Sequence, residues 1–422
     1  MSRQYLNLTA GAWRQLRRNW HLRPSPMLLW QTLAPGSLFA ALTGLQETVN
    51  RQQLAQANFR NAVVVLGYWR SGTTLLHELL CLDERYTYPT THACMNPHHF
   101  LFSEASALAQ QGSSTQRPMD EMEVRPSSPQ EDEFALLSLG ARSPYEALLI
   151  PEVLPQALML TDPRELSPQD EKRWREVFLS FLAGVSMRGA GRPMILKSPT
   201  HGARVSTLRE LLPDARYVLI VRDPLTSFES VVRMWRKMFE TYAIGPIPPD
   251  DDIREAVLAD RPRFEAKLAS GTADLPSNRF TTITYETLVA NPGEVIEQLY
   301  TRLELGDFHP VREAVIGETK RRSEYQAKGK LPSEVWQQRI GATGQRSSDA
   351  TQLYGNAYPP GRTSLRAFLE PTTRSDSAAN FQLAMTGIVQ CGLACLRARS
   401  RWRRARDRCW LAPARSASRQ LH

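Results

Sequence analysis

The stretch that constrains the fold most is VVVLGYWRSGTTLLHELL, residues 63–80. Its first four residues are apolar, which suits a parallel strand that is covered on both faces. Gly67 and Gly72 frame the turn that follows, and the apolar spacing after Thr73 is helical. A strand, a glycine-framed turn and a helix in this order are typical of a loop that binds phosphate through backbone N–H groups and the helix N-terminus.

Three further strand–helix pairs follow along the chain. Their strands are expected at residues 193–197, 215–221 and 279–285, each followed by helical apolar spacing. This alternation predicts an α/β fold with a P-loop-type parallel β-sheet flanked by helices. Residues 86–190 form a long insertion, and we expect it to place helices over the ligand crevice at the sheet edge. Residues 243–278 are a second irregular or helical insertion.

Composition divides the chain into three parts. Residues 59–340 carry the strand–helix pattern and are expected to form the α/β domain, after an N-terminal helical or interfacial region at residues 1–58. Residues 341–422 are rich in Ser, Thr, Gly, Pro and Arg, which predicts a largely disordered, Arg-rich tail. Of the formal charge of +9, residues 391–422 supply +8 through nine Arg and one Asp. The rest of the chain is therefore nearly neutral, and no nucleic-acid partner is expected.

The apolar segment at residues 26–45 contains Gln31, Pro35 and Gly36. A helix pair that is broken at Pro35 and packs on the domain is favoured over a membrane span. Peripheral contact with a bilayer surface is the alternative, because basic and Trp-containing sequence precedes the segment. The N-terminus shows no signal-peptide pattern, and the five cysteines suit a reducing compartment. We therefore expect a cytoplasmic protein, with peripheral membrane contact as an option.

The loop differs from that of a nucleotide triphosphatase in its charges. Thr73 stands where a triphosphatase carries its lysine, and the basic residue is Arg70, inside the loop. Two later strands end in Lys197 and Arg222, where an acid that helps to hold magnesium would otherwise be expected. Cations without a metal suit a ligand whose 5′ end carries less charge than ATP, such as a phosphate joined to sulfate. We therefore expect no metal.

The motif YWRSGTT resembles the 5′-phosphosulfate loop of sulfotransferases that use 3′-phosphoadenosine 5′-phosphosulfate (PAPS), in the bacterial branch that has RSGTT. In VRDPLTSFES, Arg222 and Ser230 have the eight-residue spacing of the family's 3′-phosphate motif. In ILKSPTH, Lys197 matches the family's lysine near the sulfuryl group. The resemblance covers about residues 60–340 and departs from cytosolic members at Leu75, where those have a Trp that stacks on adenine.

The resemblance implies PAPS as co-substrate and a hydroxyl-bearing small molecule, lipid or glycan as acceptor. It implies that Arg70 and Lys197 are catalytic. The basic loop at residues 320–331 is similar to a family loop over the nucleotide. The implied nucleotide-binding residues are Gly67, Arg70, Ser71, Gly72, Thr73, Thr74, Arg222, Ser230, Arg321 and Arg322.

The general base is the residue that the motifs leave open. His92 and Glu131 in the insertion are the first candidates, ahead of Glu133 and His201. Two other functions remain compatible with the sequence. One is a small-molecule kinase of the same fold, which would use ATP and magnesium, and the other is a non-catalytic nucleotide-binding protein associated with a membrane.

Overall fold

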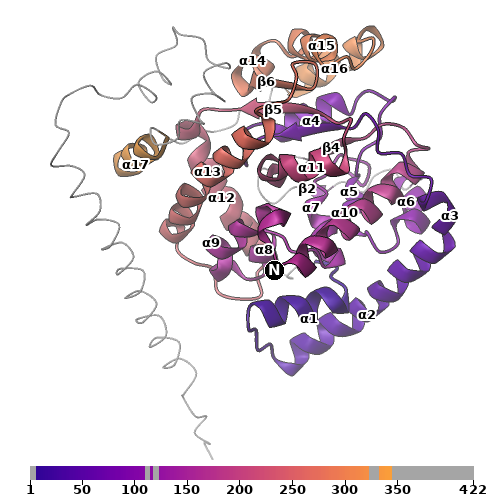
Figure 1. Ribbon diagram of the computed structural model, residues 1–422. Coiled ribbons are helices and arrows are strands. Elements are labelled where there is room, and N and C mark those ends of the chain that lie inside the picture. The colour runs from indigo at the N-terminus through magenta and orange to yellow at the C-terminus, as the bar shows by residue number, and fades with distance from the viewer. Residues whose placement is uncertain (1–5, 110–114, 117–122, 323–331, 345–422) are drawn as a thin grey trace, which may run out of the picture. The chain divides into compact units, whose positions relative to one another are not determined.

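The computed structural model describes residues 6–109, 115–116, 123–322 and 332–344, all within the first of two compact units, Met1–Leu369. Its central sheet has the strand order β4-β1-β5-β6, and every pairing in it is parallel. Figure 1 shows this sheet among helices on both sides. The strands are β1 (Val63–Leu66), β4 (Ile195–Lys197), β5 (Arg216–Val221) and β6 (Phe280–Thr284). The predicted α/β class and all four predicted strands are confirmed.

Helices bury both faces of the sheet because strand side chains alternate between them. Val63 and Val65 belong to one apolar cluster, and Val64 and Leu66 to the other. The first cluster is completed by α4 (Thr73–Leu80), α14 (Tyr285–Ala290), α15 (Pro292–Arg302) and α16 (His309–Arg322). The second receives side chains from α10 (Pro168–Arg188), α11 (Val205–Leu211), α12 (Pro224–Tyr242) and α13 (Asp250–Thr272).

The insertion between α4 and β4 is helical, as predicted. Its remaining helices are α5 (Thr91–Met95), α6 (Phe100–Ala109), α7 (Glu133–Leu139), α8 (Glu146–Leu149) and α9 (Leu154–Ala157). Short 3₁₀ turns lie at Pro151–Val153, Leu158–Thr161, Pro163–Glu165 and Pro199–Arg204, and a two-residue pair joins β2 (Thr115–Gln116) to β3 (Glu123–Val124). The second predicted insertion contains α13, a single helix of 23 residues.

The predicted helix break at Pro35 is wrong. After α1 (Ala10–Asn19), α2 runs unbroken over Pro26–Val49 and leads into α3 (Arg51–Leu54). Pro35 is exposed, so water can hydrogen-bond the carbonyl that loses its N–H partner to the proline ring. Gly36, on the buried side, lets α1 approach, because a Cβ there would lie 2.7 Å from the backbone nitrogen of Ala10.

The predicted boundary at residue 340 falls inside a helix. α17 spans Glu334–Gly344, and its Trp336 packs on Phe228 of α12, with ring centroids 5.9 Å apart. The rest of the predicted tail lies outside the described residues, so its predicted disorder stays a prediction.

The strand order places a ligand crevice between β1 and β5. From β1 the chain moves to β4 on one side, and from β5 it moves to β6 on the other side. Connections that leave a sheet in opposite directions open a crevice at the carboxyl ends of the two strands involved. The loop that begins at Gly67, after β1, and Arg222, after β5, therefore both lie at this crevice.

Candidate active site

The loop between β1 and α4 has a constrained backbone. Gly72 caps α4 with φ +103°, and a Cβ there would lie 2.4 Å from the ring of Tyr285. Arg70 also has a left-handed φ of +65°. Such a conformation costs a non-glycine residue about 1–3 kcal/mol and persists where the surroundings enforce it, often at functional sites. The sequence therefore needs glycine at position 72, and the fold holds Arg70 in one orientation.

The loop presents the groups that an anion needs. The first backbone N–H groups of α4, from Thr73 onward, have no partner within the helix, and the helix dipole favours negative charge at this end. The hydroxyl of Ser71 is buried in the loop and has no hydrogen-bond partner among the described residues. A buried hydroxyl without a partner is costly unless a ligand satisfies it. These groups fit a bound phosphate or phosphosulfate.

The two predicted nucleotide motifs are in contact. Nε of Arg70 donates to the hydroxyl of Ser230 on α12 at 3.0 Å. Nη1 of Arg222 donates to the backbone carbonyl of Arg70 at 3.4 Å, and its guanidinium lies over the ring of Tyr285, 4.3 Å from the centroid. The loop after β1 and the motif after β5, 160 residues apart at their closest contact, therefore form one basic cluster.

Lys197 is held beside this cluster by a carboxylate. It lies at the end of β4 and is in register with Val65 of β1. Val65 lies two residues before the loop begins at Gly67. Its Nζ donates to Oε1 of Glu131 at 2.8 Å, and the hydroxyl of Tyr145 donates to Oε2 of the same carboxylate. Burial and the nearby Glu131 raise the pKa of Tyr145 well above its usual range, so the phenol stays protonated and acts as a donor.

Glu133 and His201, the lower-ranked base candidates, lie next to buried ionisable groups. Glu133 is fully buried and accepts from Arg204 at 2.8 Å, from Thr200 at 2.6 Å and from the hydroxyl of Ser143 at 2.6 Å. His201 is also fully buried, 3.0 Å from a carboxylate oxygen of Asp132. Partners of this kind leave no lone pair of Glu133 for an acceptor proton.

His92 lies in different company from Glu131. Its Nε2 shares a hydrogen bond with Ser103 at 2.8 Å, and its ring meets that of His99 edge-on at 6.3 Å. Both contacts lie within the insertion and involve neither Lys197 nor the loop. Partial burial lowers the pKa of His92. The structure therefore brings Glu131 into contact with Lys197, and among the described residues it shows no such contact for His92.

The two basic-loop candidates stay predictions. Arg321 is on the exposed side of α16 and pairs with Glu318 of the same helix. Arg322 ends that helix, and residues 323–331 lie outside the described ranges. In the described part of the chain, no group of three His, Cys, Asp or Glu side chains could hold a metal ion.

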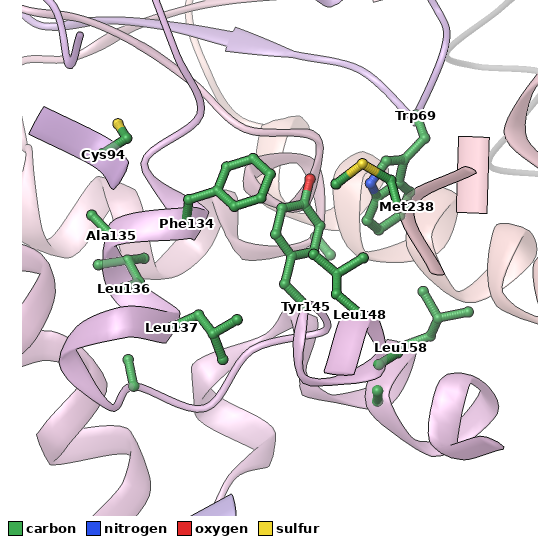
Figure 2. Packing of buried hydrophobic residues seen from close by; sticks show 14 of the residues in the cluster. Trp69, Cys94, Phe134, Ala135, Leu136, Leu137, Tyr145, Leu148, Leu158 and Met238 are labelled. Atoms are coloured by element: carbon green, nitrogen blue, oxygen red, sulfur yellow. The ribbon is translucent and has the colours of Figure 1, made fainter. Parts of the chain in front are cut away.

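An apolar pocket of about 70 Å³ opens at Glu131. Its ring–ring contacts join Tyr145 to Phe134 at 5.1 Å and to Trp235 at 6.2 Å. Figure 2 shows Phe134, Tyr145, Leu148 and Met238 gathered in this region near Trp69 of the loop. The pocket is lined by Met95, Gln130, Glu131, Phe134, Tyr145, Leu148, Met234, Trp235, Met238 and Tyr242.

Sequence reasoning missed Tyr145, Tyr285 and the pocket wall. A signal existed for part of the wall, because Met234, Trp235, Met238 and Tyr242 form an apolar stripe on the helix that carries Ser230. No local pattern marks Tyr145 or Tyr285, whose roles depend on contacts with residues distant in sequence.

A buried carboxylate supports the loop from below. The hydroxyl of Tyr68, next to Gly67, donates to Asp260 of α13 at 3.2 Å, and Arg263 donates to the other oxygen of Asp260 at 3.3 Å. Burial, opposed by Arg263, raises the pKa of Asp260 to about 6. Tyr68 also meets the ring of Phe264 edge-on at 5.0 Å, so α13 anchors the first half of the loop.

The comparisons with known proteins agree with this geometry. The model of a family described as the sulfotransferase family matches residues 62–310, which include the loop, Lys197, Arg222 and Ser230. The chain belongs to the sulfotransferase family. The resemblance carried by YWRSGTT is confirmed at this level.

Two curated relatives of this family member are similar over part of their length. Both are named omega-hydroxy-beta-dihydromenaquinone-9 sulfotransferase Stf3, one from Mycobacterium bovis and one from Mycobacterium tuberculosis. Each is 34% identical over 247 residues, which are 58% of this chain and 63% of the relative. The match thus spans less than two thirds of those relatives.

Two solved sulfotransferase structures share the fold. STF1 from Mycobacterium tuberculosis H37Rv has a TM-score of 0.54 at 17% identity, covering 73% of this chain and 81% of that one. STF9 from Mycobacterium avium has a TM-score of 0.55 at 15% identity, covering 82% of this chain and 98% of that one. Identities this low show the fold alone.

The raised pKa of Asp260 predicts a pH-dependent contribution to stability. Because the folded pKa of about 6 exceeds the usual value near 3.9, the folded state binds this proton more tightly. The contribution is complete below about pH 4 and is lost as pH rises through about 6. Urea unfolding of wild type and of Asp260→Asn measures this contribution. The free energy of unfolding of wild type, minus that of the variant, should fall by about 2–3 kcal/mol between pH 4 and pH 7. The exposed Asp252→Asn on the same helix should show no such trend; equal trends in both variants would contradict the assignment.

Proposed function

We propose that the protein transfers a sulfuryl group from PAPS to the hydroxyl of an apolar alcohol. The observation that carries the proposal is the contact of Arg70 with Ser230 and of Arg222 with the Arg70 carbonyl. It joins the loop suited to a 5′-phosphosulfate to the motif suited to a 3′-phosphate. Only a ligand with an anionic group at each end uses both.

The proposal divides the donor between the two motifs. The 5′-phosphosulfate binds the backbone N–H groups of the loop, the hydroxyl of Ser71 and the first turn of α4. The 3′-phosphate binds Arg222, whose planar guanidinium suits two phosphate oxygens at once, and Ser230. ATP lacks the 3′-phosphate, so these two residues select PAPS.

Glu131 is the base in the proposed reaction. Its carboxylate takes the proton of the acceptor hydroxyl while that oxygen attacks sulfur, and the bond between sulfur and the bridging oxygen breaks. The electron pair leaves with adenosine 3′,5′-bisphosphate, where Lys197 and Arg70 stabilise the growing negative charge. Lys197 has three N–H donors, and Glu131 accepts from one of them, so the lysine can serve both groups. The product is a sulfate ester.

The pocket at Glu131 favours an apolar acceptor. Three of its methionine and tryptophan side chains come from α12 and Met95 comes from α5. Its polar groups are Glu131, Gln130 and the hydroxyls of Tyr145 and Tyr242. Such a pocket suits a hydrocarbon body with its hydroxyl at the carboxylate. The curated relatives are named as sulfotransferases of a hydroxylated menaquinone derivative, which supports the same substrate class. A long-chain or prenyl alcohol is therefore preferred over a glycan.

The donor assignment predicts selective nucleotide binding. Adenosine 3′,5′-bisphosphate should bind in calorimetry without added metal, and Arg222→Ala should weaken it at least tenfold because a charge-assisted pair is lost. Arg216 provides a matched control, since it stands at the opposite end of the same strand, β5. Arg216→Ala should bind the nucleotide like the wild type. A protein that bound only ATP with magnesium would instead be a kinase of this fold.

The base assignment predicts a loss confined to turnover. Glu131→Gln keeps an oxygen that can accept from Lys197 and places an amide NH2 beside the Tyr145 hydroxyl, but it cannot take a proton, so kcat should fall about 10²–10⁴-fold. The affinity for adenosine 3′,5′-bisphosphate should stay within twofold of wild type. The exposed Glu152→Gln in the same insertion should leave kcat unchanged. Initial rates with PAPS decide the matter, and a kcat for Glu131→Gln within threefold of wild type would exclude this base.

The apolar pocket predicts that a polar substitution in its wall raises the KM for the acceptor. Met238→Gln should raise the KM for an apolar alcohol about tenfold, a loss of about 1.4 kcal/mol of binding, because an amide replaces a buried thioether. Rates over a panel of prenyl alcohols, long-chain alcohols, phenols and sugars measure this effect. Met159→Gln, at an exposed methionine, is the control. If sugars were the best substrates and Met238→Gln left their KM unaltered, the apolar assignment would be wrong.

A further inference from the structure

The helix α2 has its polar side toward the protein and its apolar side toward solvent. On the inner side, the amide of Gln46 donates to the carbonyl of Pro97 at 3.0 Å and accepts from the N–H of Leu101 at 2.9 Å. Thr43 shares a hydrogen bond with the ring of His98 at 3.1 Å. Polar contacts of this kind usually lie on the outer face of a helix in a soluble domain, so this helix is inverted.

The outer side of α2 carries a continuous apolar stripe. At 100° per residue its members point within one narrow sector, and they extend over about 27 Å of helix. Trp30 is 74% exposed, Met27 68%, Leu38 58% and Leu45 52%. The stripe, which we call the α2 outer face, consists of Met27, Trp30, Ala34, Leu38, Ala41 and Leu45.

The charges that precede the α2 outer face in the sequence are of one sign. Residues 1–46 contain five arginines and no lysine, aspartate or glutamate, and no ionisable residue lies between Arg23 and Glu47. Arg14, Arg18 and Arg23 are exposed on the N-terminal side, and Arg51 is exposed just beyond α2. A basic flank beside an apolar stripe is complementary to anionic lipid headgroups above acyl chains. Trp30 is of the residue type favoured at that boundary.

We propose that the α2 outer face docks this protein on the surface of a bilayer that contains anionic phospholipid. By length and composition α2 is the one helix in the described part of the chain that could cross a membrane. Its hydrogen bonds to Pro97, His98 and Leu101 keep it against the folded unit instead. The helix therefore lies along the surface, with its stripe among the lipids.

The docked helix is fastened to the acceptor pocket. The amide of Asn7, just before α1, donates to the carbonyl of Met95 at 3.1 Å, and Met95 lines the pocket. The inner side of α2 is hydrogen-bonded to Pro97 and Leu101, and Pro97 lies two residues after Met95. If the acceptor is a lipid alcohol, which rests on the proposed function, docking brings the pocket wall next to the phase that holds it.

Vesicle sedimentation of the full chain tests the proposal. Wild type should bind vesicles that contain phosphatidylglycerol at least tenfold more tightly than vesicles of phosphatidylcholine alone. The triple variant Trp30→Ser, Leu38→Ser, Leu45→Ser should lose at least tenfold of the binding to the anionic vesicles. The matched control Met159→Ser, Val289→Ser, Val335→Ser replaces equally exposed apolar residues outside α2 and should bind like wild type. The arginine-rich residues 391–422 are present in every variant and cannot cause the difference.

Three outcomes would overturn the proposal. They are no vesicle binding by wild type, equal binding by the triple variant, and extraction by detergent alone, which would mean that α2 spans the bilayer. A dimer in sedimentation equilibrium that the triple variant abolishes, without vesicle binding, would assign the face to a second copy. Binding of adenosine 3′,5′-bisphosphate, measured on the same preparations, reports folding and keeps the two proposals separate. If wild type bound vesicles but not this nucleotide, the donor site would be refuted and the docking proposal would be unaffected.

Discussion

The guanidinium of Arg222 lies between the backbone carbonyl of Arg70 and the ring of Tyr285. This contact joins the ends of β1 and β5 at the point where the chain changes direction through the sheet. Arg70, Arg222 and Lys197 all carry positive charge at the same sheet edge, and like charges this close repel. The fold offsets the repulsion with a carbonyl, an aromatic face and the Glu131 carboxylate. Such an arrangement of cations fits the proposed ligand with two anionic ends.

One helix couples the two halves of the site. α12 begins just after Arg222, carries Ser230 beside the loop, and then lines the apolar pocket with Met234 and Met238. Trp69 of the loop meets Trp235 of the same helix at 6.0 Å, and Trp235 meets Tyr145 at 6.2 Å. A shift of α12 would therefore disturb the nucleotide motif and the pocket together. Glu131 stands where the polar and apolar halves join.

α2 packs on the folded unit in a different way from the other helices. Elsewhere apolar side chains are buried between helices and the sheet, which is the main driving force for folding. α2 is held by hydrogen bonds from Thr43 and Gln46 and by the close approach that Gly36 allows, together with the apolar contacts of Leu33 and Phe39. Its apolar surface remains available for an external partner. Large exposed apolar patches on soluble domains mark such partners.

The sequence by itself determined the strands, their parallel pairing and the phosphate-type loop. These features depend on local apolar runs and on backbone conformations that only certain residues adopt, such as that of Gly72. Spacing along the chain also predicted that Arg222 and Ser230 act together, and in the structure each of them contacts Arg70. Local pattern failed at Pro35, because whether a proline breaks a helix depends on which side of the helix it occupies.

Only the tertiary structure distinguished the surroundings of Glu131, Glu133, His92 and His201. The sequence ranked His92 and Glu131 ahead of Glu133 and His201, but it could not choose between a histidine and a glutamate. They differ in which distant groups surround them: Glu131 meets Lys197, whereas Glu133 is taken up by Arg204. The partners that distinguish these two carboxylates, Lys197 and Arg204, lie 66 and 71 residues away along the chain. Such partners come together only when the insertion packs over the sheet edge, and no local pattern records that packing.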